Sequence, residues 1–447
     1  MCGVLVSSKN IDNLNTELLN FRGPDAANQI KKNNVTYLQT LLSITGEFTE
    51  QPIIRDNVVF LYNGEIYNYN DSFSFPSDIY VIIEKYFNYG EDFIKHLDGE
   101  FAIIIADYRK NILFFATDIF GTKPLFFSDS EKDFGLSSNR ESLEELGFLD
   151  IMKAEPSSIY KIDLNTYKII EKNQYFSFDL NNNKKHFNDW EDAFIDSVKK
   201  RFRKTDKRII LPLSSGFDSG AILCAFNILN INFASFSFFN YEHEKVLNKR
   251  LKKIVTPNEF FTKNKLSSEE RIETLELMKS RCAKFYYDPG LQEQKDSIDG
   301  FQDSGSLGLA YLLNFMQNID SDLRILASGH GADEIMSNIQ SYTLNESNPK
   351  IFPKKLDDIF PWENFYLGTQ SSYLSKEESI TGGFGVEGRY PFLDKNVVQE
   401  FLYLDSDLKN STFKSPIVYF LKKNNFPYRK KSFRFPRNED LKSGFNA

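Results

Sequence analysis

Residues 208–226 read RIILPLSSGFDSGAILCAF: a short apolar strand, a loop of small polar residues and an apolar helix from Asp218 onward. A second apolar strand at residues 324–327 ends in a Gly-containing loop before residues 332–335. Strands that alternate with helices in this way predict a parallel, doubly wound α/β sheet. Such sheets bind ligands beyond the carboxyl ends of their strands, where we expect both loops to lie.

The part of the chain before this stretch follows a different pattern. Residues 78–89 have helical periodicity, and short apolar or β-branched runs bounded by Gly, Asn and Asp occur at 58–62, 101–106, 112–116 and 125–127. We expect an α+β fold of stacked, mainly antiparallel sheets with helices. The polar stretch 181–185 is the best candidate for a linker. The sequence therefore predicts two domains, residues 1–180 and 187–447.

The composition is that of a globular protein without a bias toward nucleic acid or membranes. Among 447 residues, 54 Lys and Arg stand against 62 Asp and Glu, a net charge of −8, which gives no attraction to DNA, RNA or an anionic membrane. Three cysteines and four scattered histidines predict neither a disulfide framework nor a structural zinc site. The first residues do not resemble a signal peptide, and no run approaches the ~18 apolar residues of a membrane span. We expect a cytoplasmic protein.

The loop of residues 213–219 has the features of an anion site. Leu213, Ser214, Ser215 and Gly216 follow the strand, and Asp218 and Ser219 open the helix. Backbone N–H groups at a helix N-terminus, together with hydroxyls, bind anions. No Gly-Lys-Ser/Thr ending is present, so the loop is not a Walker A motif. Taken alone, Ser-Ser-Gly is also typical of an ordinary loop or a helix N-cap.

Cys2 is a candidate nucleophile. Methionine before a small residue is usually removed, which would place the Cys2 thiol beside a free α-amino group with an ordinary pKa of about 7.7–8.0. Such an amine can act as general base for its own side chain. The alternative is that the Met-Cys start is a chance feature of the sequence.

Several short motifs accompany Cys2 in the first half of the chain. In order they are RGPD at 22–25, NGEIYN at 63–68, SD at 77–78, LDGEFA at 97–102 and DIFGTKPL at 118–125. Together they resemble the class II glutamine amidotransferase domain, an N-terminal-nucleophile hydrolase. The resemblance implies that Cys2 attacks the side-chain amide of glutamine and releases ammonia.

The same resemblance assigns the residues that bind glutamine. The Asn63 side chain and the Gly64 N–H would hold the tetrahedral oxyanion, and Glu65 and Asp78 would hold the glutamine amino group. The alternative for Asn63-Gly64 is a hairpin turn, because this dipeptide is a strong turn signal. One departure concerns Leu41, which stands where the family has an arginine that pairs with the glutamine carboxylate. Either another cation anchors glutamine, or the enzyme works partly with free ammonia.

The second half resembles another set of motifs. Residues 213–219 resemble the PP-loop of ATP pyrophosphatases, with Ser215 in the place of one glycine. SGHGADE at 328–334 and GVEGRYPFLD at 385–394 resemble segments of asparagine synthetases, and Lys414 lies where these enzymes have a late catalytic lysine. The chain is therefore identified as a divergent, shortened member of the asparagine synthetase family.

This resemblance implies ATP and Mg²⁺ as cofactors and adenylation of a carboxylate. Asp218 and Asp333 would hold Mg²⁺ on the pyrophosphate oxygens, and Lys414 would stabilise charge on the α-phosphate. The residues that would flank adenosine are Leu213, Phe238, Ser328 and Gly329. Glu387 is a second catalytic candidate, although an ion pair between Glu387 and Arg389 that organises the loop is an equally good interpretation. Homodimers are common in the family, so we allow for a homodimer.

His330 stands where asparagine synthetases have a glutamate and β-lactam synthetases a tyrosine. A histidine can act as a base near neutral pH. We expect the acceptor to be aspartate or, because His330 replaces the family's glutamate, another carboxylic acid. The alternative is a loop histidine without a role. Two other functions stay open. One is a ligase that closes an intramolecular amide, as β-lactam synthetases and lasso-peptide cyclases do, and the other is a catalytically silent regulatory homologue.

Overall fold

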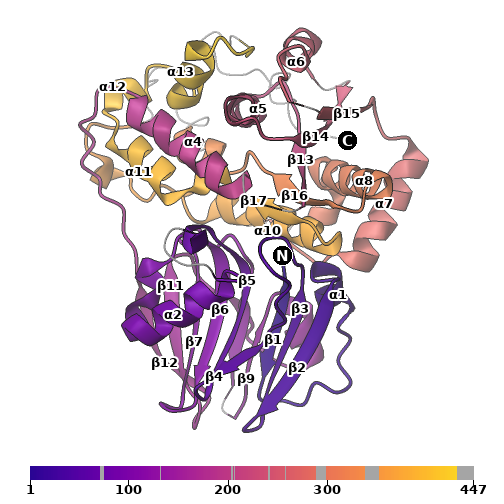
Figure 1. Ribbon diagram of the computed structural model, residues 1–447, viewed down its shortest axis with the longest axis vertical. Coiled ribbons are helices and arrows are strands. Elements are labelled where there is room, and N and C mark those ends of the chain that lie inside the picture. Colours follow the sequence, from indigo (N-terminus) through magenta and orange to yellow (C-terminus); the bar gives the residue numbers. More distant parts are fainter. Residues whose placement is uncertain are drawn as a thin grey trace. The chain divides into compact units, whose positions relative to one another are not determined.

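The computed structural model describes residues 1–70, 75–130, 132–202, 205, 207–239, 242–256, 258–287, 299–337 and 352–429. The chain divides into two compact units. The first comprises Met1–Ser177, Met278–Lys284 and Glu378–Glu387, and the second comprises Phe178–Leu277, Phe285–Glu377 and Gly388–Ala447. Figure 1 draws most of the first unit in indigo and purple. The sequence does not predict that two short segments of its second half join the first unit.

The first unit contains two six-stranded sheets, and the strand pairs among its described residues are antiparallel. The first sheet has the order β10 (Met152–Lys153), β8 (Phe126–Asp129), β9 (Phe134–Ser137), β1 (Gly3–Ser7), β3 (Val35–Leu41), β2 (Ala26–Lys32). The second has the order β12 (Lys168–Gln174), β11 (Ser158–Asp163), β7 (Ile112–Thr117), β6 (Gly99–Asp107), β5 (Val58–Ile66), β4 (Ile53–Arg55).

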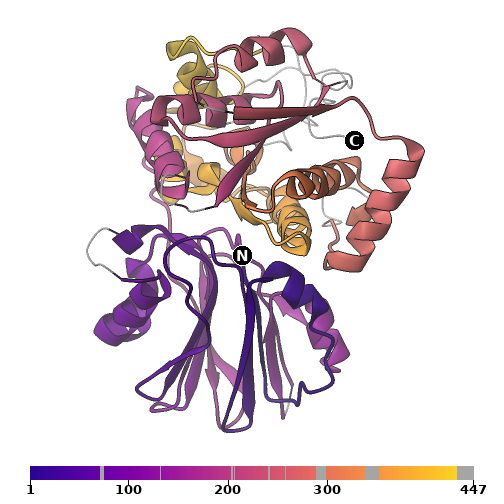
Figure 2. The same ribbon diagram turned by 45° about the vertical axis from the view of Figure 1, so that its right-hand side comes forward.

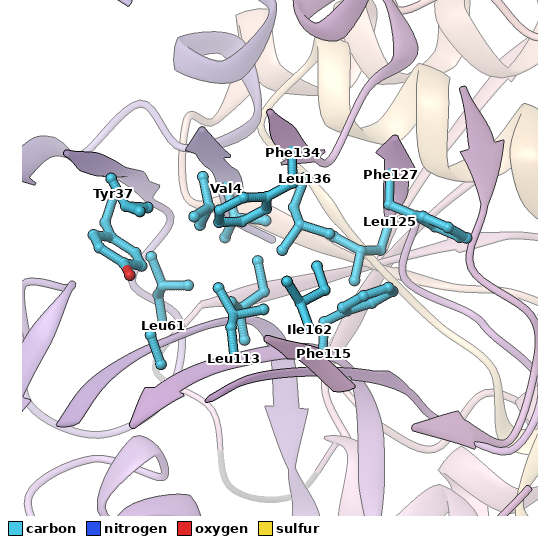
Figure 3. Close-up of a cluster of buried hydrophobic side chains, with 14 of the residues drawn as sticks. Val4, Tyr37, Leu61, Leu113, Phe115, Leu125, Phe127, Phe134, Leu136 and Ile162 are labelled. Atoms are coloured by element: carbon cyan, nitrogen blue, oxygen red, sulfur yellow. The ribbon is translucent and has the colours of Figure 1, made fainter. Parts of the chain in front are cut away.

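The two sheets bury a common core between them. Val4 and Tyr37 of the first sheet meet Leu61, Leu113 and Phe115 of the second, as Figure 3 shows. Alternate residues of each strand face outward, because successive side chains of a strand point to opposite faces. Helices α1 (Glu17–Arg22) and α3 (Arg140–Glu145) cover the outer face of the first sheet, and α2 (Ile79–Tyr89) covers that of the second. The predicted stacked-sheet fold with helices is confirmed.

The two added segments are tied to the first unit by cationic side chains. Arg281 lies 4.8 Å from the ring centroid of Phe21 and 5.1 Å from that of Phe384, within the range of a cation–π interaction. Glu378 forms buried ion pairs with Arg22 and Lys123. These contacts link positions far apart in the sequence, so local patterns cannot reveal them.

The second unit is built on a five-stranded sheet, which Figure 2 shows from a second side. Its order is β15 (Asn258–Lys263), β14 (Phe233–Phe238), β13 (Arg208–Pro212), β16 (Leu323–Ala327), β17 (Glu387–Arg389). The pairs β15–β14, β14–β13 and β13–β16 are parallel. The helices of this half are α4 (Asn188–Phe202), α5 (Phe217–Leu229), α6 (Glu244–Leu251), α7 (Ser268–Arg281), α8 (Ser304–Ile319), α9 (Ala332–Met336), α10 (Gly368–Gly383), α11 (Lys395–Tyr403), α12 (Ser406–Lys409) and α13 (Ser415–Lys423).

The strand order places a ligand-binding position at the centre of this sheet. From β13 the chain proceeds through α5 to β14 on one side, while β16 lies on the other side of β13. At such a switch point the loops after the two central strands diverge and leave room for a ligand. The loops concerned follow Pro212 and Ala327, as the sequence predicts, and the doubly wound parallel sheet is confirmed. In the described part of the chain, no helix has the length and hydropathy to span a bilayer.

Candidate active sites

Cys2 lies directly before β1 and is buried. Its backbone N–H donates to Asn63 Oδ1 at 2.7 Å, and its carbonyl accepts a hydrogen bond from Arg22 Nε at 3.2 Å. Burial raises the pKa of the Cys2 thiol, whereas the amino-terminal ammonium group, the backbone N–H of Leu42 and the side chain of Gln39 act to lower this pKa. Burial outweighs these neighbours, so the Cys2 thiol must lose its proton to a base before it becomes the nucleophilic thiolate.

Asn63 and Gly64 lie within β5, paired with Ala102 and Phe101 of β6, and not at a turn. Asn63 is fully buried, and its Nδ2 has no hydrogen-bond partner among the described residues. Buried donors without partners are rare, so this one is available to a ligand beside Cys2. Gly64 has φ 136°, and a Cβ there would lie 1.9 Å from the Glu100 carbonyl oxygen. Only glycine allows the backbone to pass at this point.

Asp78 and Glu65 are buried carboxylates of the same unit. Asp78 accepts the Ile66 N–H through Oδ2 at 3.0 Å, and burial raises its pKa to about 6. Tyr62 hydrogen-bonds to Asp78 and is influenced by the charges of Asp78, Glu65 and Cys2, which places the three groups around one ring. Two carboxylates in this position give the site a negative potential suited to a cationic amine.

Leu41, the departure from the family pattern, ends β3 and is buried. Its backbone pairs with Ala26 of β2. Alternation along the strand puts Leu41 on the same face as Gln39, whose Nε2 donates to the Tyr62 carbonyl at 2.7 Å. This position therefore faces β5 with an apolar side chain and supplies no charge for a carboxylate.

A buried group of charges supports the backbone of Cys2. Arg22 Nη2 lies 3.3 Å from Glu378 Oε2, and Lys123 Nζ lies 2.9 Å from Glu378 Oε1. Because one carboxylate holds both cations, the Arg22 side chain is fixed with Nε on the Cys2 carbonyl. Removal of Glu378 would leave two buried cations without this partner, a costly arrangement.

The loop after β13 is organised by its own hydroxyl groups. Ser214 Oγ lies 2.8 Å from Ser219 Oγ and accepts the Gly216 N–H at 3.1 Å, while Ser219 Oγ accepts the Ser214 N–H at 3.1 Å. The Leu213 N–H donates to the Phe236 carbonyl at 2.9 Å, which ties the loop to β14. The hydroxyls of Ser214 and Ser219 thus accept two of the backbone N–H groups of this loop, which lies at the start of α5, a position that favours anions.

Two acidic residues and a lysine meet beside this loop. Lys414 Nζ lies 2.7 Å from each carboxylate oxygen of Asp218 and 2.8 Å from Asp333 Oδ2. Burial raises the pKa of Asp218 to about 6, and the two carboxylates raise the pKa of Lys414 above its ordinary value despite burial. Within the described residues, no group of three or more His, Cys, Asp or Glu side chains could hold a metal by itself. Two carboxylates fit Mg²⁺, which usually takes its other ligands from phosphates and water.

His330 follows β16 and is buried. Its Nε2 lies 3.2 Å from the Gln370 carbonyl oxygen and 2.9 Å from Gln370 Nε2, and its Nδ1 lies 3.9 Å from Glu334 Oε2. Burial lowers the pKa of His330 and raises the pKa of Glu334 to about 7. The imidazole is therefore neutral near pH 7, and a neutral imidazole has one nitrogen that can accept a proton.

The remaining predicted residues occupy several positions. A Cβ on Gly329 would lie 3.0 Å from Asp218 Cβ, so the loops after β13 and β16 are in contact. Ser328 Oγ donates to Glu377 Oε2 at 2.6 Å, and Phe238 is buried at the end of β14. Glu387 belongs to the first unit and lies 3.0 Å from the amino-terminal nitrogen of Met1. A catalytic role for Glu387 stays a prediction.

Sequence reasoning missed several residues that contact these groups. Gln39 and Leu42 contact the thiol, Arg22 binds the Cys2 carbonyl, and Gln370 holds His330. Glu242 accepts the Ser215 N–H. Arg22 belongs to the RGPD motif, which is a signal for its importance. Nothing local distinguishes Gln370 or Glu242 from other polar residues.

Several known proteins are similar in sequence to this chain. Residues 1–176 match a family model described as a glutamine amidotransferase domain. A Methanocaldococcus jannaschii protein assigned as asparagine synthetase [glutamine-hydrolyzing] 1 is 28% identical over 421 residues, which cover 85% of this chain and 71% of that protein. An Acanthamoeba polyphaga mimivirus protein assigned as a glutamine-hydrolyzing asparagine synthetase is 24% identical over 442 residues, 87% of this chain and 74% of that protein.

Among solved structures, a glutamine phosphoribosylpyrophosphate amidotransferase from B. subtilis complexed with ADP and GMP covers 47% of this chain and 60% of its own. Its sequence is 15% identical to this chain, and the TM-score is 0.34. The sequence similarity extends across both halves of the chain and includes an amino-terminal amidotransferase domain. Residues 1–176 form a glutamine amidotransferase domain, and the chain as a whole is similar to glutamine-hydrolysing asparagine synthetases, so it is an asparagine synthetase-like enzyme.

Proposed function

We propose that this protein is a glutamine-hydrolysing, ATP-dependent amidotransferase. Cys2 releases ammonia from glutamine in the first unit, and the second unit adenylates a carboxylic acid and converts it to an amide. Glutamate, AMP and pyrophosphate are the other products. The observation that carries the proposal concerns Asn63: its buried Nδ2 has no hydrogen-bond partner in the described part of the chain, and its Oδ1 accepts the backbone N–H of Cys2 at 2.7 Å.

The chemistry at Cys2 follows from these groups. The Cys2 thiolate attacks the side-chain carbonyl carbon of glutamine, and the developing oxyanion accepts hydrogen bonds from Asn63 Nδ2 and the Gly64 N–H. Collapse of this intermediate breaks the C–N bond and releases ammonia, and water then hydrolyses the thioester to glutamate. The α-amino group of Cys2, exposed once Met1 is removed, moves the protons. Glu65 and Asp78 hold the amino group of glutamine.

The chemistry at the second site uses the loop after β13. Backbone N–H groups of the loop bind the β- and γ-phosphates, and Leu213, Phe238, Ser328 and Gly329 border the adenosine. The acceptor carboxylate attacks the α-phosphorus, pyrophosphate leaves, and Lys414 stabilises the charge that develops on the α-phosphate. Asp218 and Asp333 would hold Mg²⁺, which supplies charge neutralisation for the phosphates. Ammonia then attacks the acyl carbon and AMP leaves.

The acceptor is aspartate or another carboxylic acid. In the attack by ammonia, a proton must leave the nitrogen, and neutral His330 is the base that we propose for it. A lowered pKa keeps its second nitrogen free of a proton near pH 7. The position of this base in a loop at the switch point of the sheet supports the assignment.

A second candidate function is an intramolecular ligase that takes its amine from its own substrate. The apolar Leu41 beside Gln39 favours it, because Leu41 supplies no charge for the carboxylate of glutamine. The intact Cys2–Asn63 pair favours glutamine as donor. The two functions differ in the origin of the nitrogen atom in the product.

The test is a panel of carboxylic acids incubated with ATP, Mg²⁺ and glutamine labelled with ¹⁵N in its amide. We expect one acid to yield a labelled amide with equimolar AMP and glutamate. Replacement Cys2→Ala should abolish the glutamine-driven reaction and retain the reaction driven by ammonium chloride. Amide product without the label supports the second function. No AMP with any acid, or full glutamine-driven turnover in Cys2→Ala, overturns the proposal.

A further inference from the structure

Glu242 is an anion that the protein places on its own phosphate loop. The Ser215 N–H donates to Glu242 Oε2, and the His243 N–H donates to Ser215 Oγ at 3.0 Å. The backbone N–H groups of this loop are the donors expected to meet phosphate oxygens at the start of α5. One of them is therefore already used by a carboxylate of the chain.

Helix α6 holds the loop at both of its ends. Glu242 and His243 stand just before α6 and bind Ser215, whereas Arg250, near its last residue, donates through Nη1 to the Ser214 carbonyl. Arg250 is fully buried, and its Nε donates to the Pro427 carbonyl at 2.9 Å. These contacts of Arg250 do not involve Glu242.

Arg250 has one side-chain nitrogen that is not used as a hydrogen-bond donor within the described residues. Its Nη2 is buried without a hydrogen-bond partner among the described residues. The guanidinium passes so close to α5 that a Cβ on Gly220 would lie 2.2 Å from Nη2. Glu242 contributes the largest favourable charge interaction that Arg250 has. After release from the Ser215 N–H, the Glu242 carboxylate would therefore still be attracted by the Arg250 guanidinium.

The consequence for phosphate binding is competition. A carboxylate oxygen and a phosphate oxygen accept the same kind of hydrogen bond, and one N–H cannot direct its full strength to both. Two anions at the same loop also repel each other. Burial raises the pKa of Glu242, which indicates that its charged form is poorly solvated where it lies.

We propose that Glu242 is an internal competitor of the nucleotide phosphates, which must displace it from the Ser215 N–H before ATP can bind. The inference rests on the proposed function, because it takes the loop to be the phosphate site. Its ligand class is a polyphosphate chain, either free pyrophosphate or that of ATP. The variant Glu242→Gln removes the charge and keeps the size of the side chain. Arg250 still donates to the Ser214 carbonyl in that variant, so we expect the backbone conformation of the loop to be retained.

The control is Glu244→Gln. It removes the same charge from an exposed side chain of α6, two residues after Glu242. Calorimetric titrations with inorganic pyrophosphate and with ATP, each with Mg²⁺, measure affinity in the full-length wild type and in both variants. We expect Glu242→Gln to bind both ligands about tenfold more tightly, a gain of about 1.4 kcal/mol. We expect Glu244→Gln to differ from the wild type less than twofold. Thermal unfolding midpoints verify that the variants are folded.

The outcomes separate the two proposals. If the wild type binds and Glu242→Gln binds equally or more weakly, Glu242 is not a competitor, while the phosphate site stands. If Glu244→Gln gains as much as Glu242→Gln, the effect is general electrostatics and the inference falls. If none of the three proteins binds pyrophosphate or ATP, the loop is not a phosphate site and the proposed function falls with the inference. A lower KM for ATP in Glu242→Gln, with glutamine hydrolysis unchanged, is the matching kinetic result.

Discussion

Replacement of Asn63 by aspartate isolates a single hydrogen-bond donor next to Cys2. Asn63→Asp keeps an oxygen that can accept the Cys2 N–H, which Asn63 Oδ1 accepts at 2.7 Å, and it exchanges the unpartnered Nδ2 for a second oxygen. Loss of one oxyanion donor typically costs about 2.7–4 kcal/mol of transition-state stabilisation, or about 100- to 1,000-fold in kcat. We therefore expect kcat for glutamine hydrolysis to fall by about that factor. AMP formation driven by ammonium chloride should be retained.

The companion variant Asn63→Ala separates catalysis from stability. It loses the same donor and also leaves the buried Cys2 N–H without its acceptor, at a cost of about 1–3 kcal/mol in folding free energy. Asn63→Asp keeps this acceptor, and its stability reports instead the cost of a buried carboxyl group. Glutamate release, ammonia-dependent AMP release and denaturant unfolding of the two variants provide the three measurements. Hydrolysis of glutamine by Asn63→Asp within tenfold of the wild-type rate would refute the assignment of Nδ2 as an oxyanion donor.

Three further predictions concern glutamine binding and the acceptor. Asp78 has a pKa raised to about 6 by burial and binds a cationic amine only when ionised, so KM for glutamine should rise about tenfold per pH unit below 6; Asp78→Asn should raise KM at all pH values and flatten this slope, and an unchanged pH profile would contradict the role. Leu41→Arg should lower KM for glutamine about tenfold or more in steady-state assays, because a charge-assisted pair then forms with its carboxylate; a variant that remains folded with unchanged KM would show that another group binds the carboxylate. His330→Ala should abolish amide formation while ATP–pyrophosphate exchange persists, whereas equal loss of both would exclude a role as base for the acceptor step.

The fold could be predicted from local features of the sequence. The apolar strand and helix around residues 213–219 identify β13, the loop and α5, because strand and helix periodicity depend on neighbours in the chain. The run 101–106 lies in β6, and residues 79–89 form the predicted helix α2. Short strands dominate the first half of the sequence, and strands alternate with helices in the second half, so the sequence predicts a different fold class for each half.

The candidate site could be predicted only in part. The residue types of Cys2, Asn63, Asp218 and Lys414 stand out in short motifs. Their partners do not: Asp218 and Lys414 are 196 positions apart and yet make a partly buried ion pair. Nothing in the sequence distinguishes Glu242 from other acidic residues, and only the structure shows that it accepts the Ser215 N–H.

The sequence by itself predicted the alternation of strands and helices, a candidate anion-binding loop and a candidate nucleophile, because these predictions depend on periodicity, turn chemistry and residue type over a few positions. Only the tertiary structure decided that Glu378 from the second half of the chain joins Arg22 and Lys123, and that Lys414 joins Asp218 and Asp333. A buried charge needs an opposite charge close in space, and the chain supplies this partner by packing, at a sequence separation that no local pattern encodes.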